Sequence, residues 1–190
     1  MNPSFVYSDN EGEDPMITKH DYLVTAMIFQ IFLLSGCSSK DPDRYYSSKD
    51  DYSIKFPKEW ENTEGLGGAS VIFLSPQENT TDQFRGRVSV IVEQFPRAME
   101  LDEYFKFYLE NTTNLLNDFQ ESEKGSTSIG DTDAKWMIYT SRTGTLTSKS
   151  QTYFIVHDKR GYLINCAATS YNFARYKSAF ADIVGSFEFD

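Results

Sequence analysis

One apolar stretch constrains this 190-residue chain more than any other feature. Residues 22–34 contain 13 consecutive uncharged and mostly apolar side chains, which lie between Asp21 and Ser35. A membrane-spanning helix needs about 20 apolar residues, whereas the hydrophobic region of a secretory signal has roughly 7–15. The length therefore predicts an export signal rather than a permanent membrane span.

A cysteine follows this stretch in a context that resembles a bacterial lipobox. The motif consists of the aliphatic Leu34, the small residues Ser35 and Gly36, and then Cys37. Small residues admit the chain to the signal peptidase, and the cysteine thiol receives a diacylglycerol group. We predict cleavage before Cys37 and anchoring by palmitate-type acyl chains on the non-cytoplasmic side of a membrane of the cell envelope. The alternative is a buried apolar helix that ends by chance at a cysteine.

The first residues do not fit a signal peptide, which begins with a positively charged region. Residues 1–15 contain no Lys or Arg but four acidic side chains. A start at Met16 would instead place Lys19 and the free amine before the apolar run. We therefore predict that Met16 is the true initiator and that residues 1–36 are leader and signal peptide.

The rest of the chain divides into a polar tether, predicted over 37–50, and one compact domain over 51–190. Residues 52–56 alternate between apolar and polar, as a half-buried strand does. Apolar residues in 101–119 instead follow the three-and-four spacing of an amphipathic helix. Together the patterns predict an α+β domain with an antiparallel sheet. The predicted strands are 52–56, 71–74, 87–95, 134–141, 151–157 and 162–168; the predicted helices are 101–119 and 172–184.

Several of these segments, taken in order, resemble PsbP-like domains. The resemblance begins with an aromatic strand, a proline and a tryptophan in residues 52–60 and continues through the valine-rich strand at 88–92. It includes the helix start at 101–104 and ends with the closing helix and Ser-Phe of residues 173–187. The usual Tyr-Pro-x-Gly-Trp is replaced by Phe-Pro-Lys-Glu-Trp at 56–60.

The resemblance implies the Mog1p/PsbP-like α/β/α sandwich, in which helices cover a central antiparallel sheet. The family that it resembles includes lipid-anchored members, among them cyanobacterial photosystem II assembly factors and many bacterial or archaeal lipoproteins. No stretch of this chain is specific enough to assign the photosynthetic branch.

The charge balance excludes a general nucleic-acid binder. The chain has 18 basic and 28 acidic side chains, a net charge of −10 with both His neutral, and an acidic chain repels phosphate backbones. The predicted mature residues 37–190 retain 17 basic and 23 acidic side chains. The acidic excess of the mature protein is therefore mild.

Candidate catalytic and ligand-binding residues are few. His157 is the only His after the predicted signal, and no Gly-x-Ser-x-Gly nucleophile motif accompanies it. Asp131 and Asp133 offer oxygens to a hard cation, but they are typical of a solvated turn. The glycine-rich residues 65–68 precede a predicted strand rather than the helix that a phosphate loop needs, and so predict a hairpin loop. We predict no catalytic residue, no metal site and no cofactor.

The remaining candidate residues are interpreted as structural or as ordinary surface residues. Arg85, Arg87 and the pair Lys159–Arg160 would form a basic patch only if folding brought them together, and ordinary surface charge is the default. Cys166 is interpreted as a small core residue. Trp60 and Trp136 are interpreted as core anchors, and the glycosylation-type triplets at Asn79 and Asn111 are interpreted as idle in a prokaryotic cell.

Three classes of function remain open. We favour a non-catalytic binding or assembly module that is held to membrane lipid through acylated Cys37 and docks on a membrane-protein complex. The alternative is a small-ligand or metal-binding envelope lipoprotein. An enzyme is the least supported class, because no nucleophile–base pair is visible in the sequence.

Overall fold

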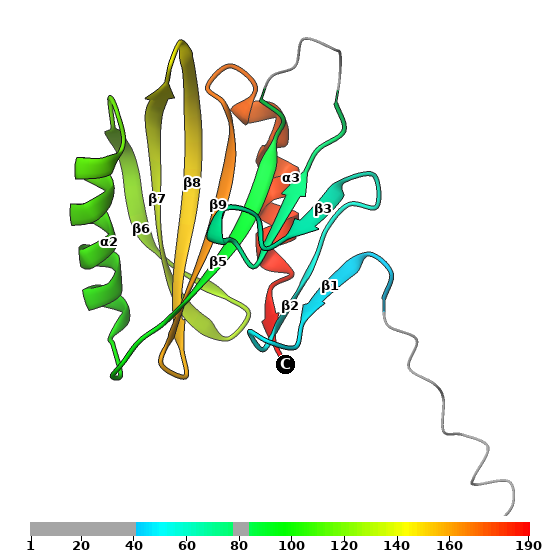
Figure 1. Ribbon diagram of the computed structural model, residues 1–190, viewed down its shortest axis with the longest axis vertical. Helices are drawn as coiled ribbons and strands as arrows, with labels where there is room; N and C mark the ends of the chain where they lie inside the picture. The colour runs from blue at the N-terminus through cyan, green and yellow to red at the C-terminus, as the bar shows by residue number, and fades with distance from the viewer. Residues whose placement is uncertain (1–40, 78–83) are drawn as a thin grey trace, which may run out of the picture. The chain divides into compact units, whose positions relative to one another are not determined.

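The computed structural model describes residues 41–77 and 84–190. Within these residues the chain forms several short strands, a long antiparallel meander of four consecutive strands, and two α-helices (Figure 1). The elements in chain order are β1 (Arg44–Ser47), β2 (Tyr52–Lys55), β3 (Glu61–Glu64), the 3₁₀ turn η2 (Leu66–Gly68), β4 (Val71–Leu74), β5 (Arg87–Gln94), α2 (Leu101–Leu115), β6 (Gln120–Ile129), β7 (Thr132–Thr143), β8 (Leu146–His157), β9 (Arg160–Thr169), α3 (Phe173–Gly185) and β10 (Glu188–Phe189).

The strands form two antiparallel sheets. The larger sheet has the order β3-β4-β5-β9-β8-β7-β6, and the smaller has the order β1-β2-β10. Tight turns join β6, β7, β8 and β9 in sequence, and β5 lies beside β9 through eight paired residues. The last strand, β10, joins the smaller sheet beside β2.

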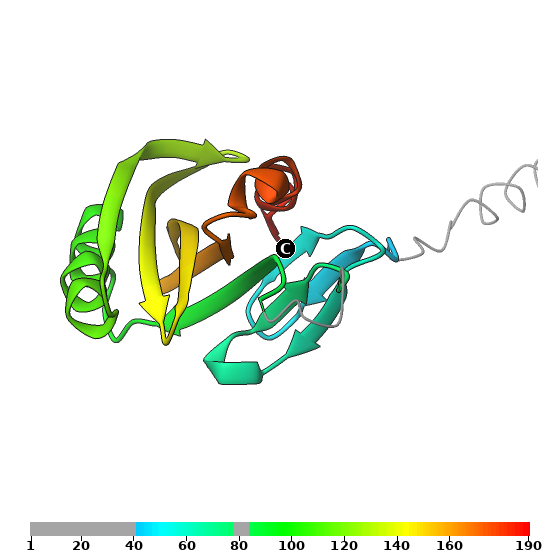
Figure 2. The same ribbon diagram turned by 90° about the horizontal axis from the view of Figure 1, so that it is seen from above.

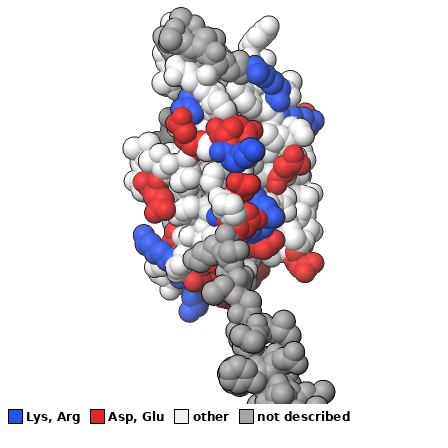
Figure 3. Space-filling model, turned by 90° about the vertical axis from the view of Figure 1, so that its right-hand side faces the viewer, with Lys and Arg blue, Asp and Glu red and all other residues white. Residues whose placement is uncertain are grey.

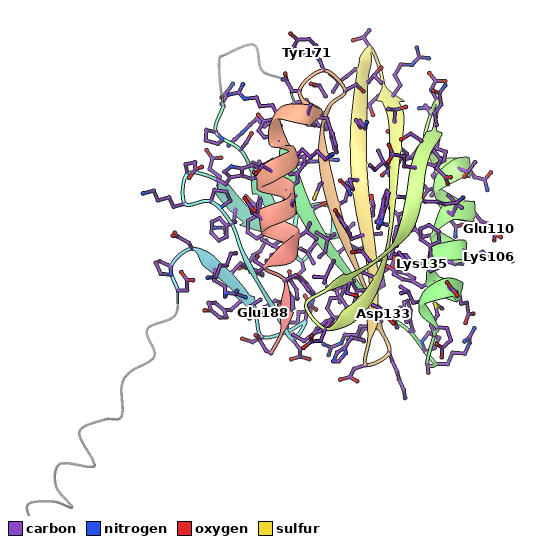
Figure 4. All side chains as sticks on the ribbon, turned by 180° about the vertical axis from the view of Figure 1, so that it is seen from behind. Lys106, Glu110, Asp133, Lys135, Tyr171 and Glu188 are labelled. Carbon is purple, nitrogen blue, oxygen red and sulfur yellow. The ribbon has the colours of Figure 1, made fainter. Side chains whose placement is uncertain are left out.

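The two helices lie on opposite faces of the larger sheet. Helix α2 lies on the side facing the viewer in Figure 1, and α3 lies in front of the sheet when the domain is seen from behind (Figure 4). The view from above shows α2 and α3 separated by the curved sheet, with β1 and β2 beside α3 (Figure 2). This arrangement confirms the expected α/β/α fold.

Each face of the sheet has its own apolar core because side chains alternate along every strand. On β5 and β9, Val88, Val90 and Cys166 belong to the core under α3. Leu163 belongs to the core under α2, with Ile91 packed against it. The helices supply their expected apolar faces, for example Phe180 of α3.

Four strands lie outside the predicted ranges, namely β1, β3, β6 and the two-residue β10. Two of them have an identifiable physical cause. The first is β1, in a segment expected to be flexible tether, so the ordered domain includes residues 41–50. Arg44 anchors β1 by donating to the Ser53 hydroxyl and the Ser186 carbonyl, at 2.9 and 3.2 Å. The second is β6, which has little alternation of apolar and polar residues because it is an edge strand and is mostly exposed.

One helix end differs from its predicted position, and two glycines lie outside the left-handed region. Helix α2 ends at Leu115 rather than at 119, because the chain reverses through Asp118, whose φ of 51° is left-handed. In the β8–β9 turn the left-handed residues are Asp158 and Lys159, not Gly161. Gly185 is the last residue of α3 and has no positive φ.

Candidate functional site

The predicted lipidation site, Cys37 with Leu34, Ser35 and Gly36, lies outside the described residues, as do Met16 and Asn79, and these assignments stay predictions. Among residues 41–77 and 84–190, no helix is both long and apolar enough to cross a membrane.

His157 lies at the end of β8, where its contacts are with an aromatic ring and a neighbouring carboxylate. Its ring stacks on Phe189 with centroids 4.1 Å apart, and its Nε2 is 3.4 Å from the carboxylate of Asp158. A Ser–His–Asp arrangement would need a hydroxyl bonded to the imidazole. In the part of the chain that the structure describes, no hydroxyl hydrogen-bonds to His157.

Asp131 and Asp133 lie at and just after the β6–β7 turn, and both are exposed. Figure 4 shows Asp133 near one end of the sheet, on the same strand as Lys135. No group of three His, Cys, Asp or Glu side chains in the described ranges is placed to hold a metal ion. The pair is therefore part of a solvated turn.

The basic residues do not gather into one patch. Arg87 begins β5, whereas Arg160 pairs with Gln94 at its other end, roughly 23 Å away at about 3.3 Å per residue. Arg85 pairs with Glu61 at 2.9 Å and Arg160 pairs with Asp51 at 2.6 Å. Acidic and basic side chains are likewise interspersed on the face seen in Figure 3.

The remaining candidates have mainly structural environments. Cys166 is fully buried, and burial raises the pKa of its thiol. Trp60 is a core anchor that meets the ring of Tyr176 edge-on at 6.1 Å. Trp136 is only half-buried and lies against Gly125, so its interpretation as a core anchor was too strong. Residues 65–68 connect β3 to β4 in a hairpin, as predicted.

An apolar concavity lies between the end of β2 and one side of α3, and we call it the β2–α3 groove. It has a volume of about 470 Å³, within the usual range of ligand sites. Its lining residues are Lys55, Phe56, Pro57, Arg175, Ser178, Ala179, Asp182, Ile183 and Ser186.

A serine fixes the two walls of the groove to each other. The backbone N–H of Lys55 donates to the Ser186 hydroxyl at 2.8 Å, and that hydroxyl donates to the Ile183 carbonyl at 2.7 Å. Ser186 thereby bonds the last turn of α3, whose carbonyls lack helical partners, to the edge of β2. Phe187 then enters the core and stacks on Tyr52 with centroids 5.3 Å apart.

The floor of the groove is apolar and its rim is charged. Phe56 stacks on Phe73 at 4.7 Å, which fixes its ring, and Ile183 is buried beneath. Lys55 and Asp182 lie at the rim, and Lys55 forms an ion pair with Asp41 at 3.2 Å. A rigid apolar floor with a polar rim suits an apolar side chain presented by another protein.

The sequence identified the segments that form this groove, but it did not predict that they contact each other. The Phe-Pro at 56–57 and the Ser-Phe at 186–187 carry the family resemblance, yet they are about 130 residues apart. Their contact follows from the three-stranded sheet, in which β2 lies between β1 and β10.

Comparison with known proteins supports the family resemblance and the fold. The sequence profile of the PsbP family matches residues 40–189. No curated protein sequence matches the chain. The chain is similar in structure to cyanobacterial PsbP (CyanoP) from Synechocystis sp. PCC 6803, with 16% identity and a TM-score of 0.61, over 83% of this chain and 99% of that chain.

Two further solved structures have the same fold. LpqN of Mycobacterium tuberculosis, described as involved in cell envelope biogenesis, is 15% identical with a TM-score of 0.58, over 78% of this chain and 85% of that chain. The Ran-binding protein Mog1p of Saccharomyces cerevisiae is 11% identical with a TM-score of 0.53, over 80% of this chain and 96% of that chain. At these identities the likeness concerns the fold alone.

Proposed function

This chain belongs to the PsbP family, and we propose that it is a lipid-anchored, non-catalytic binding module that docks through the β2–α3 groove on a protein complex of the cell envelope. The observation that carries this proposal is the groove itself. Its floor and its Ser186 tie are built from residues through which the chain resembles its family. Its apolar, fixed walls favour binding over chemistry.

Two structural neighbours support the class of partner. LpqN is described as involved in cell envelope biogenesis, and Mog1p is described as Ran-binding, so this fold includes a protein-binding member. The predicted signal and lipobox at residues 22–37 point to the cell envelope, and LpqN is described as involved in the biogenesis of that envelope.

Filling the groove tests the docking surface. We expect Ala179→Lys to place a charged side chain over the apolar floor and to reduce capture of the partner from detergent-solubilised membranes by about tenfold or more, because a desolvated apolar contact is lost. Capture is measured with the purified wild-type chain, the Ala179→Lys variant and a control variant on the same membrane extract. The bound proteins are identified by mass spectrometry.

Ala181→Lys is the matched control, because Ala181 is exposed on the same helix and does not line the groove. We expect it to capture the partner like wild type. Equal losses in both variants, or unchanged capture by Ala179→Lys with wild-type stability, would contradict groove docking.

The lipid anchor has a separate test. We expect Cys37→Ser to abolish metabolic labelling with palmitate and to move the protein from the membrane to the soluble fraction of the producing cells, since acyl chains would supply the membrane affinity. Cys166→Ala is the control and should keep the label, because Cys166 is buried in the core. Label that persists in Cys37→Ser would refute the lipobox assignment.

A further inference from the structure

One part of the α2 face of the larger sheet has no α-helix over it. Figure 1 shows α2 on the β6–β8 side of this face, and neither α2 nor α3 lies in front of β5 and β9. Here the sheet presents polar side chains rather than the apolar ones that lie under α2. We call Arg87, Ser89, Asn165 and Thr152 the Arg87 shelf.

The strand register places these four residues together. Ser89 of β5 pairs directly with Asn165 of β9, and Asn165 pairs directly with Thr152 of β8. Arg87 lies two residues from Ser89 and therefore on the same face. Neighbouring strands are about 4.8 Å apart, so a small ligand can touch Arg87, Ser89 and Asn165 at once.

Arg87 is short of hydrogen-bond partners. Its Nε is buried without a partner, and within residues 41–77 and 84–190 the guanidinium makes no hydrogen bond or ion pair. Its recorded contact is with the ring of Phe84, 5.2 Å from the guanidinium carbon to the ring centroid. A buried polar atom without a partner is costly and calls for an unseen water or ion.

Asn165 adds a second set of free donors. Its side-chain oxygen accepts a hydrogen bond from the Thr152 hydroxyl at 3.0 Å. This bond directs the oxygen to β8 and leaves the amide N–H groups without a partner among the described residues. The shelf thus offers guanidinium, amide and hydroxyl donors together.

Two carboxylates on this face of the described sheet are already engaged. Glu61 lies in the same cross-strand row as Arg87, with Leu74 between them, but it pairs with Arg85 at 2.9 Å. Glu93, further along β5, accepts a hydrogen bond from the Tyr104 hydroxyl at 2.9 Å. Neither carboxylate neutralises Arg87 in this structure.

We propose that the Arg87 shelf binds a carboxylate group. A guanidinium matches a carboxylate through two parallel N–H···O bonds, and the Asn165 amide and Ser89 hydroxyl donate to the oxygens from the side. One arginine balances one negative charge, which favours a carboxylate over a phosphate. The shelf and the β2–α3 groove share no residues, so this site does not depend on the proposed function.

The test is an NMR titration of the full chain carrying Cys37→Ser, with acetate as the probe. We expect saturable shifts of the Arg87 Nε–H and Asn165 side-chain N–H signals with acetate and none with acetamide, its neutral counterpart. A capped peptide with one glutamate is titrated in parallel, and tighter binding than acetate would assign the carboxylate to a protein, while equal or weaker binding would assign it to a free small acid.

Three variants keep the proposal falsifiable. Arg87→Met should weaken acetate binding about 10-fold or more, because a charge-assisted hydrogen bond is lost, while Arg142→Met on the surface should not. Asn165→Asp should place a carboxylate beside Arg87, abolish the acetate response and raise the melting temperature. Unchanged acetate binding in folded Arg87→Met or in Asn165→Asp, tighter binding of phosphate than of acetate, or an equal response to acetamide would overturn the proposal.

Discussion

Gly161 lies under two aromatic rings at the start of β9. A Cβ at this position would lie 2.5 Å from Phe95 Cζ and 2.6 Å from Tyr104 Cζ. Both rings belong to the core under α2, and they contact each other at 5.1 Å between centroids. The glycine therefore makes room for close packing and does not supply a left-handed turn.

We predict that Gly161→Ala destabilises the domain by about 1–3 kcal/mol, because an added methyl group forces the packed rings apart. The free energy of unfolding in urea measures the effect. Gly185→Ala should be neutral or stabilising by about 0.5–1 kcal/mol, since Gly185 is helical with nothing within 4 Å of its added Cβ. A Gly161→Ala variant as stable as wild type would show that the rings are free to move.

The environments of some single residues could be predicted from the sequence, and those of others could not. The burial of Cys166 followed from its apolar neighbours in sequence and is confirmed. The close packing at Gly161 was not predicted, and the left-handed residues of the preceding turn are Asp158 and Lys159. Local sequence indicates that a turn is present, but the packing of Tyr104 on Gly161 depends on a helix some 57 residues away.

At the scale of elements, periodicity identified those that bury one face. Helix α3 was predicted within one residue at each end, because Phe173, Tyr176 and Phe180 all meet the same sheet face. The pattern fails for β6, whose edge position leaves both faces largely exposed and removes the need for alternation. It fails also for β1, which is ordered by partners distant in sequence.

Those distant partners explain why the domain begins earlier than expected. Tyr45 of β1 packs edge-on against Phe73 at 6.1 Å and lies 6.0 Å from the ring of Tyr52. Arg44 forms an ion pair with Glu188 at 3.2 Å, and Figure 4 shows Glu188 beyond the end of α3. No property of the short segment Arg-Tyr-Tyr-Ser by itself predicts these contacts.

At the scale of the whole molecule, buried tyrosines set the response to alkaline pH. Burial raises the pKa of Tyr108 and of Tyr153 to about 12. It also raises the pKa of Tyr52 and Tyr104, and the neighbouring Glu93 adds to the rise at Tyr104. The folded domain thus keeps these phenols neutral at a pH where the unfolded chain ionises them.

The stability of the domain should therefore be intact below pH 10 and fall as pH rises from about 10 to about 12, because the unfolded state loses protons first. Unfolding free energy measured by circular dichroism across this range checks the sign. Tyr108→Phe removes one such group and should lessen the loss by roughly 2 kcal/mol at its upper end. A stability that stays level to pH 12 would show that these phenols reach solvent.

The sequence by itself determined the fold class and the family, because these depend on local signals: the period of apolar residues, and short motifs in a fixed order. Tertiary structure alone decided the β2–α3 groove, the Arg87 shelf and the place of β1. Each of these depends on which strands pair and in what register, and pairing is set by contacts between residues far apart in the chain, which no local pattern records.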